Sequence, residues 1–241
     1  MQIIQSKLLN QFIGITHGFT TKKNGNLAFH VGDDVNNVNK NHTLLAREML
    51  YKRDKLVHMK QIHSSIVKII DNIDNFTNPP ICDAMITNSK NTPLMVMVAD
   101  CSPILFYDAK RDVIAVAHAG RAGAFKNIIQ TVIRSFTDDF DSHPNDIVVS
   151  IGASIGSCCY EVGEDIYSEA KELNLAYAIS KRQDSYYLDI SKILKSQLIN
   201  AKILENSIEF SNECSCCKNE KYFSYRAQNI TGRFAGVIFL N

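Results

Sequence analysis

Cys101 and His118 bracket the stretch of this sequence whose residue types could do chemistry. Between them lie two apolar runs rich in β-branched residues, Ser102–Tyr107 and Val113–Ala117, separated by the polar segment Asp108–Asp112. This pattern predicts a β-hairpin with a short loop. A thiol and an imidazole at the base of one hairpin are close enough to act together.

The predicted pairing of the two strands brings these side chains together. If Tyr107 pairs with Val113, then Cys101 lies opposite Ala119, one rung from His118. Cβ atoms of paired residues lie about 4.5–5.5 Å apart, and zinc ligands approach the metal to about 2.0–2.3 Å. The alternative is that Cys101 is a small buried hydrophobic residue and that His118 is a hydrogen-bonded histidine at a strand end.

A catalytic zinc ion usually has three protein ligands and leaves its fourth position to water or substrate. His63 is the candidate third ligand. Cys101 follows His63 by 38 residues and precedes His118 by 17, which matches no compact zinc-finger spacing. Spacing alone therefore leaves the metal site open.

Six ordered blocks of the sequence resemble the laccase-domain family, whose members have been described as polyphenol oxidase, purine nucleoside phosphorylase and peptidoglycan editing factor. The blocks cover nearly the whole chain and read MKQIHSS, CDAMITN, ADCSPILFYD, AVAHAG, GASIGSCCYEVG and YFSYRAQNITGRFAGVIFL. The resemblance implies that His63, Cys101 and His118 hold a metal ion. It also implies a β-sandwich-like core covered by helices.

Four residues are candidates for binding a purine nucleoside and phosphate. Gln61 could bind a purine edge, orient His63 or be a satisfied buried amide. Arg226 matches the family's Ser-Tyr-Arg block. A helix is predicted to begin near Gly123, and helix N-termini attract phosphate. Arg121 stands where the family usually has tryptophan, and the next position, usually arginine, is alanine.

Two carboxylates are candidates for catalysis. Glu161 is the candidate general acid–base, because a zinc deaminase needs a carboxylate that is not itself a ligand; it could equally be an acidic residue at a helix start. Asp100 adjoins Cys101, and Asp83 lies at the start of a strand predicted from Cys82 to Thr87. Either carboxylate could orient a metal-bound histidine or cap a turn.

Seven cysteines, an odd number, in a chain without an evident export signal predict reduced thiols. Cys158 and Cys159 are adjacent, so their side chains diverge in a regular strand and at most one is expected to face a site. Read as C-x-C-C, Cys214, Cys216 and Cys217 show neither the C-x₂-C spacing nor the distant partner pair of a structural zinc site. No second metal site is expected there.

Composition bounds the remaining possibilities. The 241 residues contain 26 Lys and Arg against 25 Asp and Glu, without a long basic stripe, which argues against a nucleic-acid partner. No apolar run reaches the roughly 20 residues that span a bilayer. We expect a soluble cytoplasmic protein without a membrane partner and, since no linker or repeat divides it, one domain over residues 1–241.

Strand patterns alternate with several helix patterns without a βαβ rhythm, which favours an α+β fold with mixed sheets. Helices are expected over residues 36–52, over 164–173, after Gly123 and before residue 203. Leu56–Ile70 has strand character, which would place Gln61 and His63 on one face of a strand.

The favoured function, given the resemblance, is a zinc-dependent purine nucleoside phosphorylase that also deaminates adenosine. Copper is possible at a His₂Cys site, which keeps a polyphenol oxidase as an alternative. Multicopper chemistry is excluded, because 7 His without a His-x-His pair cannot supply such a cluster. Two further alternatives are a Cys–His hydrolase acting on a peptidoglycan precursor and a metal-stabilised binding protein without turnover.

Overall fold

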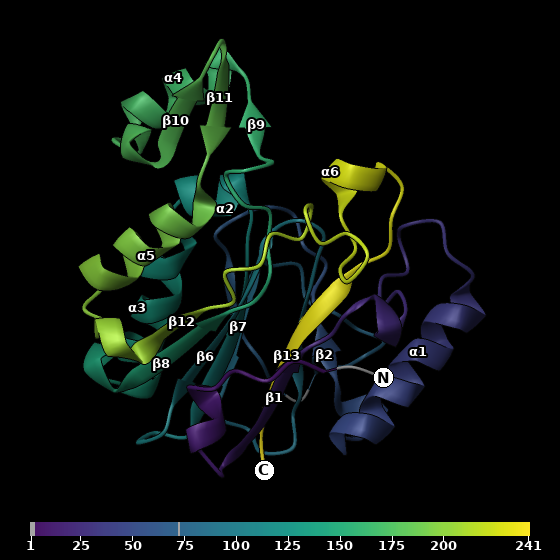
Figure 1. Ribbon diagram of the computed structural model, residues 1–241. Coiled ribbons are helices and arrows are strands. Elements are labelled where there is room, and N and C mark those ends of the chain that lie inside the picture. Colours follow the sequence, from purple (N-terminus) through teal and green to yellow (C-terminus); the bar gives the residue numbers. More distant parts are fainter. Residues whose placement is uncertain (1–2, 72) are drawn as a thin grey trace.

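Two β-sheets packed face to face form the centre of the computed structural model, which describes residues 3–71 and 73–241 (Figure 1). The larger sheet has six strands in the spatial order β12 (Ile208–Phe210), β8 (Ile147–Ile151), β6 (Ser102–Asp108), β7 (Val113–Ala119), β4 (Ala84–Thr87) and β3 (Val67–Ile69). The two outermost pairs, β12–β8 and β3–β4, are parallel, and the other neighbours are antiparallel. The sheet is therefore mixed.

The smaller central sheet has four strands, in the order β1 (Ile15–Phe19), β13 (Phe234–Leu240), β5 (Leu94–Val98) and β2 (Val57–His58). A separate three-stranded sheet, β10 (Ile179–Arg182), β11 (Ser185–Leu188) and β9 (Glu161–Val162), projects at the top of Figure 1 beside α4 (Glu164–Glu172). Sequence patterns did not predict this third sheet.

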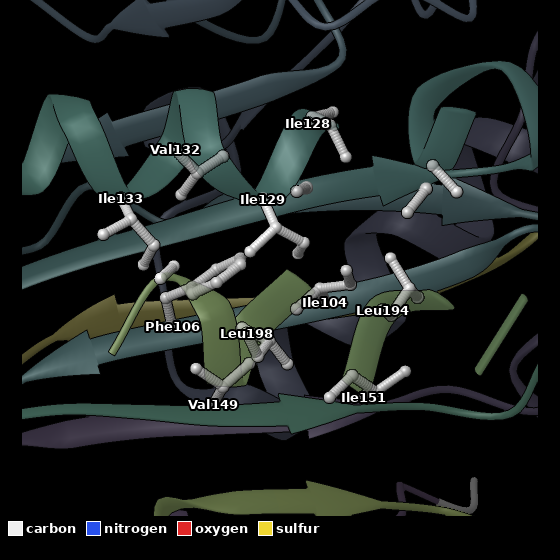
Figure 2. Packing of buried hydrophobic residues seen from close by; sticks show 14 of the residues in the cluster. Ile104, Phe106, Ile128, Ile129, Val132, Ile133, Val149, Ile151, Leu194 and Leu198 are labelled. Carbon is white, nitrogen blue, oxygen red and sulfur yellow. The ribbon is translucent and has the colours of Figure 1, made fainter. Parts of the chain in front are cut away.

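Side chains alternate between the two faces of β6, as a strand requires. Leu105 and Tyr107 point into the core between the two large sheets, whereas Ile104 and Phe106 point to the helices. Figure 2 shows Ile129 and Val132 packed over these two side chains. Every residue of β6 and β7 is buried, so the hairpin is covered on both faces.

Helices cover the outer faces of both sheets. α2 (Arg121–Phe125), α3 (Ile128–Phe140) and α5 (Ile190–Asn200) pack on the six-stranded sheet, and α1 (Val35–Met49) packs on the four-stranded sheet. The layer order is thus helices, sheet, sheet and helix, which confirms the predicted α+β, sandwich-like core flanked by helices. The remaining short helices are α6 (Tyr225–Gln228), η1 (Leu9–Gln11), η2 (Lys22–Asn24), η3 (Arg53–Lys55), η4 (Pro144–Asp146), η5 (Ala176–Ala178) and η6 (Glu205–Ser207).

The predicted hairpin is present, but its register is shifted by one residue. Tyr107 pairs with Ile114, and Asp108 joins the ladder opposite Val113. The reason lies in the loop: the Asp108 carboxylate accepts the amides of Lys110 and Arg111, and Asp112 adopts a left-handed conformation. Cys101 therefore continues β6 toward Gly120, not toward Ala119.

Two other local predictions are corrected. The segment that carries Gln61 and His63 is a loop between β2 and β3, and His63 has φ +57°, which a regular strand does not allow. The helix expected after Gly123 is split into α2 and α3, because Asn127 is left-handed and its side chain accepts the amide of Gln130 to start α3 anew. In the described part of the chain, no helix is long and apolar enough to cross a bilayer.

Candidate metal centre and active site

Three side chains that are far apart in the sequence meet at one end of the β6–β7 hairpin. His63 comes from the loop between β2 and β3, Cys101 lies directly before β6, and His118 lies near the end of β7. Their possible ligand atoms all lie within 4.8 Å of one another. Ligand atoms around a tetrahedral zinc ion are separated by about 3.3–3.8 Å, so a small adjustment brings these three to bonding distance.

Gly120 makes room for the sulfur atom of Cys101. A Cβ atom at Gly120 would lie 2.5 Å from Cys101 Sγ and 3.6 Å from a ring carbon of His63. Any residue other than glycine would therefore displace the thiol. The shifted register explains this close approach. Ser102 pairs with Ala119, so Cys101, directly before β6, lies opposite Gly120, directly after β7.

Asp83 organises the loop that presents His63. Its fully buried carboxylate accepts the backbone amides of Ile62, His63 and Ser64 at 3.2, 3.0 and 2.6 Å, and also the Ser64 hydroxyl at 2.7 Å. Three successive amides converging on one carboxylate hold the left-handed backbone at His63. Burial raises the pKa of Asp83, but hydrogen bonds from His118 and Ser64 outweigh it and lower the pKa overall.

The same carboxylate orients His118. His118 Nδ1 lies 2.9 Å from Asp83 Oδ1, so Nδ1–H donates to the carboxylate and Nε2 is left for another partner. The imidazoles of His63 and His118 have centroids 4.8 Å apart and are nearly perpendicular, at 76°. This confirms that a buried carboxylate before β4 orients one of the predicted ligands.

Cys101 and His118 shift each other's protonation. Burial raises the pKa of the Cys101 thiol, but the His118 charge and hydrogen bonds from His118 and His63 outweigh it and lower the pKa to about 6. Burial lowers the pKa of His118, whereas Cys101 and Asp83 raise it, with a net pKa of about 9. The thiolate, which is the form that binds metals and attacks electrophiles, is therefore accessible near neutral pH.

The donor set fits a divalent metal ion. Two imidazoles and one thiolate form the ligand set of several catalytic zinc sites, and the Asp83–His118 hydrogen bond is the outer contact that such ligands usually make. His63 is exposed and Cys101 half-buried, so one side of the cluster is open. The three residues could hold an ion and leave a position for water or substrate.

Two cavities reach this open side. The first, of about 520 Å³, is lined by His63 and Cys101 and by a set of polar and charged residues: Asp100, Arg121, Tyr160, Tyr225, Arg226 and Asn229. The second, of about 500 Å³, touches all three cluster residues and is lined further by Phe29, His30, His58, Gln61, Met97 and Arg233. Each has the size of a small-molecule site, and the cluster lies where they meet.

Comparison with known proteins places this geometry in a family. Residues 13–241 match the family model described as multi-copper polyphenol oxidoreductase laccase. The chain belongs to this laccase-domain family. A purine nucleoside phosphorylase of Corynebacterium glutamicum is 34% identical over 233 residues, which cover 92% of this chain and 93% of that protein. One of Clostridium acetobutylicum is 33% identical over 222 residues and covers 92% and 88%.

Solved structures agree with the fold. The hypothetical protein YfiH of Bacillus licheniformis superposes with a TM-score of 0.90 at 28% identity, covering 97% of this chain and 94% of that one. YlmD of Geobacillus stearothermophilus gives a TM-score of 0.87 at 26% identity, covering 95% and 93%. Relatives named as phosphorylases make this a family of enzymes.

Within the laccase-domain fold, Gln61 contacts the main chain. Its Nε2 donates to the Met97 carbonyl at 2.8 Å, and its Oε1 accepts the Met97 amide at 3.1 Å. Both ends of the amide are therefore used to fix the loop that carries His63 to β5. Gln61 touches the second cavity, but this geometry favours a structural role over recognition of a purine.

Of the two phosphate-binding residues predicted at α2, Arg121 lines the first cavity and Gly123 does not. Arg121 Nη1 lies 2.6 Å from Glu169 Oε2 on α4. Gly123 is buried inside α2, where an added Cβ would lie 3.3 Å from the His118 carbonyl oxygen and 3.5 Å from that of Ser64. α2 begins at Arg121, two residues before Gly123, and the cavity is lined at this turn by Gly120 and Arg121.

Asp100 and Arg226 are joined to each other at the cavity wall. Asp100 Oδ2 accepts the Arg226 amide at 2.9 Å, and Oδ1 accepts the Ser215 hydroxyl at 2.5 Å. The Arg226 guanidinium lies 5.5 Å from the Tyr160 ring centroid and donates to the Glu161 carbonyl. Both Asp100 oxygens thus hold neighbouring segments in place, which suits a positioning residue.

Glu161 is not among the residues that line the cavity. Its carboxylate accepts the Ser185 hydroxyl at 2.7 Å and the Tyr187 hydroxyl at 3.4 Å, so it faces β11. The physical reason is the pairing of β9 with β11, which sequence patterns did not predict. This geometry argues against Glu161 as the general acid–base.

Tyr160, Tyr225 and Asn229 line the cavity and were missed. Tyr160 directly precedes Glu161 in the GSCCYEVG block, and Tyr160, not Glu161, lines the cavity. Burial and the nearby Cys101 raise the pKa of the Tyr160 phenol, which keeps its proton available for hydrogen bonding.

Proposed function

We propose that the chain is a zinc-dependent purine nucleoside phosphorylase that cleaves adenosine, inosine or 5′-methylthioadenosine with phosphate and also deaminates adenosine, and that residues 1–241 form one domain. One observation carries the proposal: an open-sided His₂Cys cluster lies where two cavities of about 500 Å³ meet. One cavity is rich in charge and the other in aromatic and thioether groups. That pairing suits a phosphate beside a nucleoside.

The phosphate is assigned to the first cavity. Arg121 and Arg226 both line it, and guanidinium groups bind phosphate oxygens through paired hydrogen bonds. The Arg226 guanidinium donates to the Glu161 carbonyl at 2.9 Å, and the Arg121 guanidinium is paired with Glu169. The two cations are therefore oriented before phosphate arrives.

The purine is assigned to the second cavity. Phe29, His58 and Met97 line it and offer flat or polarizable surfaces to a planar base. His58 has its pKa lowered by burial, so it enters this wall as a neutral ring. A purine stacked here places its ribose near the His₂Cys cluster between the cavities.

Phosphorolysis transfers a glycosyl group. A phosphate oxygen forms a bond to ribose C1′, the C1′–N bond breaks, and the purine leaves with the bonding electron pair and takes up a proton. In this reaction Arg121 and Arg226 hold the nucleophile, and the Tyr160 phenol, which lines the same cavity, donates a hydrogen bond to the phosphate. Zinc, bound by His63, Cys101 and His118, would lower the pKa of bound water toward about 7, the property that deamination requires.

Chromatography of adenosine with zinc-loaded protein tests the proposal. Adenine must appear only when phosphate is present, with an equal amount of ribose 1-phosphate, and inosine must appear without phosphate. Cys101→Ser removes a ligand and must abolish both reactions, while Cys82→Ser, a buried cysteine outside the site, must keep them. If wild-type protein yields neither adenine, hypoxanthine nor inosine, the proposal fails.

Two imidazoles and a thiolate can bind either zinc or copper, and the two metals support different chemistry. We propose zinc, the metal that the proposed deamination uses. Copper binds more tightly at most nitrogen and sulfur sites, so metal selection needs its own test. Protein purified without added metal is expected to contain zinc and to leave polyphenols unoxidised. Copper at one ion per chain, with oxidation of a catechol, would favour the polyphenol oxidase instead.

A second candidate function is a Cys–His hydrolase, for example on a peptidoglycan precursor, and the shifted pKa values of Cys101 and His118 favour it specifically. Asp83, His118 and Cys101 also follow one another in the order of a carboxylate, a base and a nucleophile. Such an enzyme would keep its activity in a chelator and lose it to iodoacetamide. A zinc enzyme loses activity in the chelator and regains it with zinc.

A further inference from the structure

Four cysteines outside the candidate active site come together where two loops meet. Cys158 and Cys159 lie between β8 and β9, and Cys214 and Cys217 lie between β12 and α6. All four sulfur atoms are within 4.8 Å of one another. Cys217 Sγ is 3.4 Å from Cys158 Sγ and 3.3 Å from Cys159 Sγ, so the cluster is held together across about 58 residues of sequence.

The backbone explains how neighbouring cysteines can face one point. Residues 157–159 form a turn, closed by the Cys159 amide on the Gly156 carbonyl at 3.0 Å, and side chains of adjacent residues can converge there. This corrects the expectation, drawn from strand geometry, that at most one of the pair faces a site.

The second pair has metal-binding spacing. Cys214 and Cys217 are separated by two residues, which is C-x₂-C, and they lie in the turn that begins at Cys214. Cys216 lies between these two cysteines, so the C-x₂-C spacing overlaps a C-x-C-C pattern, and the distant partner pair is the Cys158–Cys159 turn. Together the two loops supply the two-plus-two arrangement of a structural zinc site.

Distances favour a metal ion over a disulfide. A tetrahedral zinc ion with bonds of about 2.3 Å to sulfur separates its ligands by about 3.8 Å, which lies inside the range found here. A disulfide needs about 2.05 Å between two sulfur atoms and would leave the other two thiols without a role. Four mutually adjacent sulfur atoms are a ligand cage.

Backbone amides also point at the cluster. Gly156 and Cys217 donate their N–H groups to Cys214 Sγ at 3.2 and 3.5 Å. Such donors stabilise sulfur that carries negative charge. The nearby lysines, Lys218 and Lys221, are paired with Glu213, so a bound dication is the natural counter-charge for several thiolates.

We propose that Cys158, Cys159, Cys214 and Cys217 bind one zinc ion in a closed tetrathiolate site with a structural role. This site is independent of the proposed reaction. It ties together two loops that build the wall of the first cavity, since Ser154, Ile155 and Tyr160 belong to the first loop. The second loop carries Ser215, which donates to Asp100, and leads into α6 with Arg226.

Zinc content of purified variants tests the site. Wild-type protein dialysed against buffer with trace zinc must hold one more zinc ion per chain than Cys217→Ser, the variant that removes the central thiol. Cys216→Ser is the matched control, because Cys216 lies in the same turn but outside the four-sulfur group. Equal zinc in wild type and Cys217→Ser, or loss of zinc in Cys216→Ser, overturns the assigned ligand set.

A second measurement keeps the test valid if Cys217→Ser does not fold. In the double variant His63→Ala/Cys101→Ser, zinc-edge absorption spectroscopy must show a shell of sulfur alone at about 2.3 Å. A shell dominated by nitrogen or oxygen overturns the proposal. So does an intact mass two hydrogens lighter with a cross-linked Cys158–Cys217 peptide, because that result identifies a disulfide.

Discussion

At the scale of single residues, Asp83 is the side chain on which both imidazoles of the candidate centre depend. Asp83→Asn keeps the shape but replaces an acceptor oxygen by a donor that faces amides and the His118 Nδ1–H. The loop would lose part of its hold on His63, and His118 would lose its fixed tautomer. Loss of such outer contacts typically weakens metal binding about 10–100-fold, which a competition titration with a chromophoric chelator measures.

Asp108→Asn is the matched control for this prediction. Asp108 is also fully buried and also accepts two backbone amides, but it does so in the hairpin loop. We expect it to lower thermal stability without changing zinc affinity. If both variants weaken zinc equally, the effect of Asp83 comes from general destabilisation and not from its contacts with the histidines.

Gly120 gives a second prediction at this scale. In Gly120→Ala the new methyl group would meet Cys101 Sγ at 2.5 Å, so the sulfur must move. A displacement of about 1 Å in a catalytic constellation costs about 100-fold in activity. We expect kcat/KM for adenosine phosphorolysis to fall by about that factor while the circular dichroism spectrum is unchanged. Gly14→Ala, whose methyl group would meet only the Tyr107 hydroxyl, should stay near wild type.

At the scale of elements, α4 positions α2 through the ion pair between Glu169 and Arg121. Arg121→Ala removes a cation from the proposed phosphate cavity, and hydrogen bonds to charged groups are worth about 1.5–3 kcal/mol, so we expect KM for phosphate to rise about 10–100-fold. Glu169→Gln keeps the guanidinium but loosens its orientation and should raise the same KM by less. Steady-state kinetics with varied phosphate measures both effects.

Arg134→Ala serves as the control for this pair, because Arg134 is exposed on α3. Nucleoside KM is expected to stay unchanged in all three variants. A phosphate KM that falls in Glu169→Gln would contradict the prediction, since Glu169 would then be competing with phosphate for Arg121.

At the scale of elements, sequence patterns predict some parts of the site and not others. The hairpin was predictable because Ile104, Leu105 and Phe106 are apolar and bounded by a polar loop, and it brings Cys101 and His118 together even with its register shifted by one. The left-handed conformation of His63 was not predictable, because it depends on amides that converge on Asp83 from a distant segment. The convergence of Cys158 and Cys159 was not predictable either, because it depends on the turn at residues 157–159.

At the scale of the whole molecule, three buried histidines lie in or against the four-stranded sheet. His17 lies on β1, His58 on β2 and His42 on α1, and burial lowers the pKa of each. His42 is fully buried, stacks on Phe29 and donates Nε2–H to the Leu27 carbonyl at 2.8 Å. The folded protein therefore keeps these rings neutral where an unfolded chain would charge them.

The sign of the resulting pH effect follows from His42, whose pKa is lowered from 6.5 to about 4. Below pH 6.5 the unfolded chain binds a proton at His42 that the folded protein does not bind. The free energy of unfolding therefore decreases as the pH is lowered from 6.5 to about 4. Between pH 7.5 and 5 this single residue removes about 2 kcal/mol. Urea unfolding followed by circular dichroism measures it, since the chain has no tryptophan.

His42→Phe keeps the aromatic stack and removes the titration, so its acid-induced loss of stability should be smaller than that of wild type by about 2 kcal/mol. Release of a metal ion in acid affects both proteins alike and cancels in the difference. His143→Phe, which changes a histidine at the surface before η4, should lose as much stability as wild type. Parallel pH profiles for His42→Phe and wild type would mean that His42 is protonated in the folded protein, against its burial among Leu27, Phe29 and Phe76.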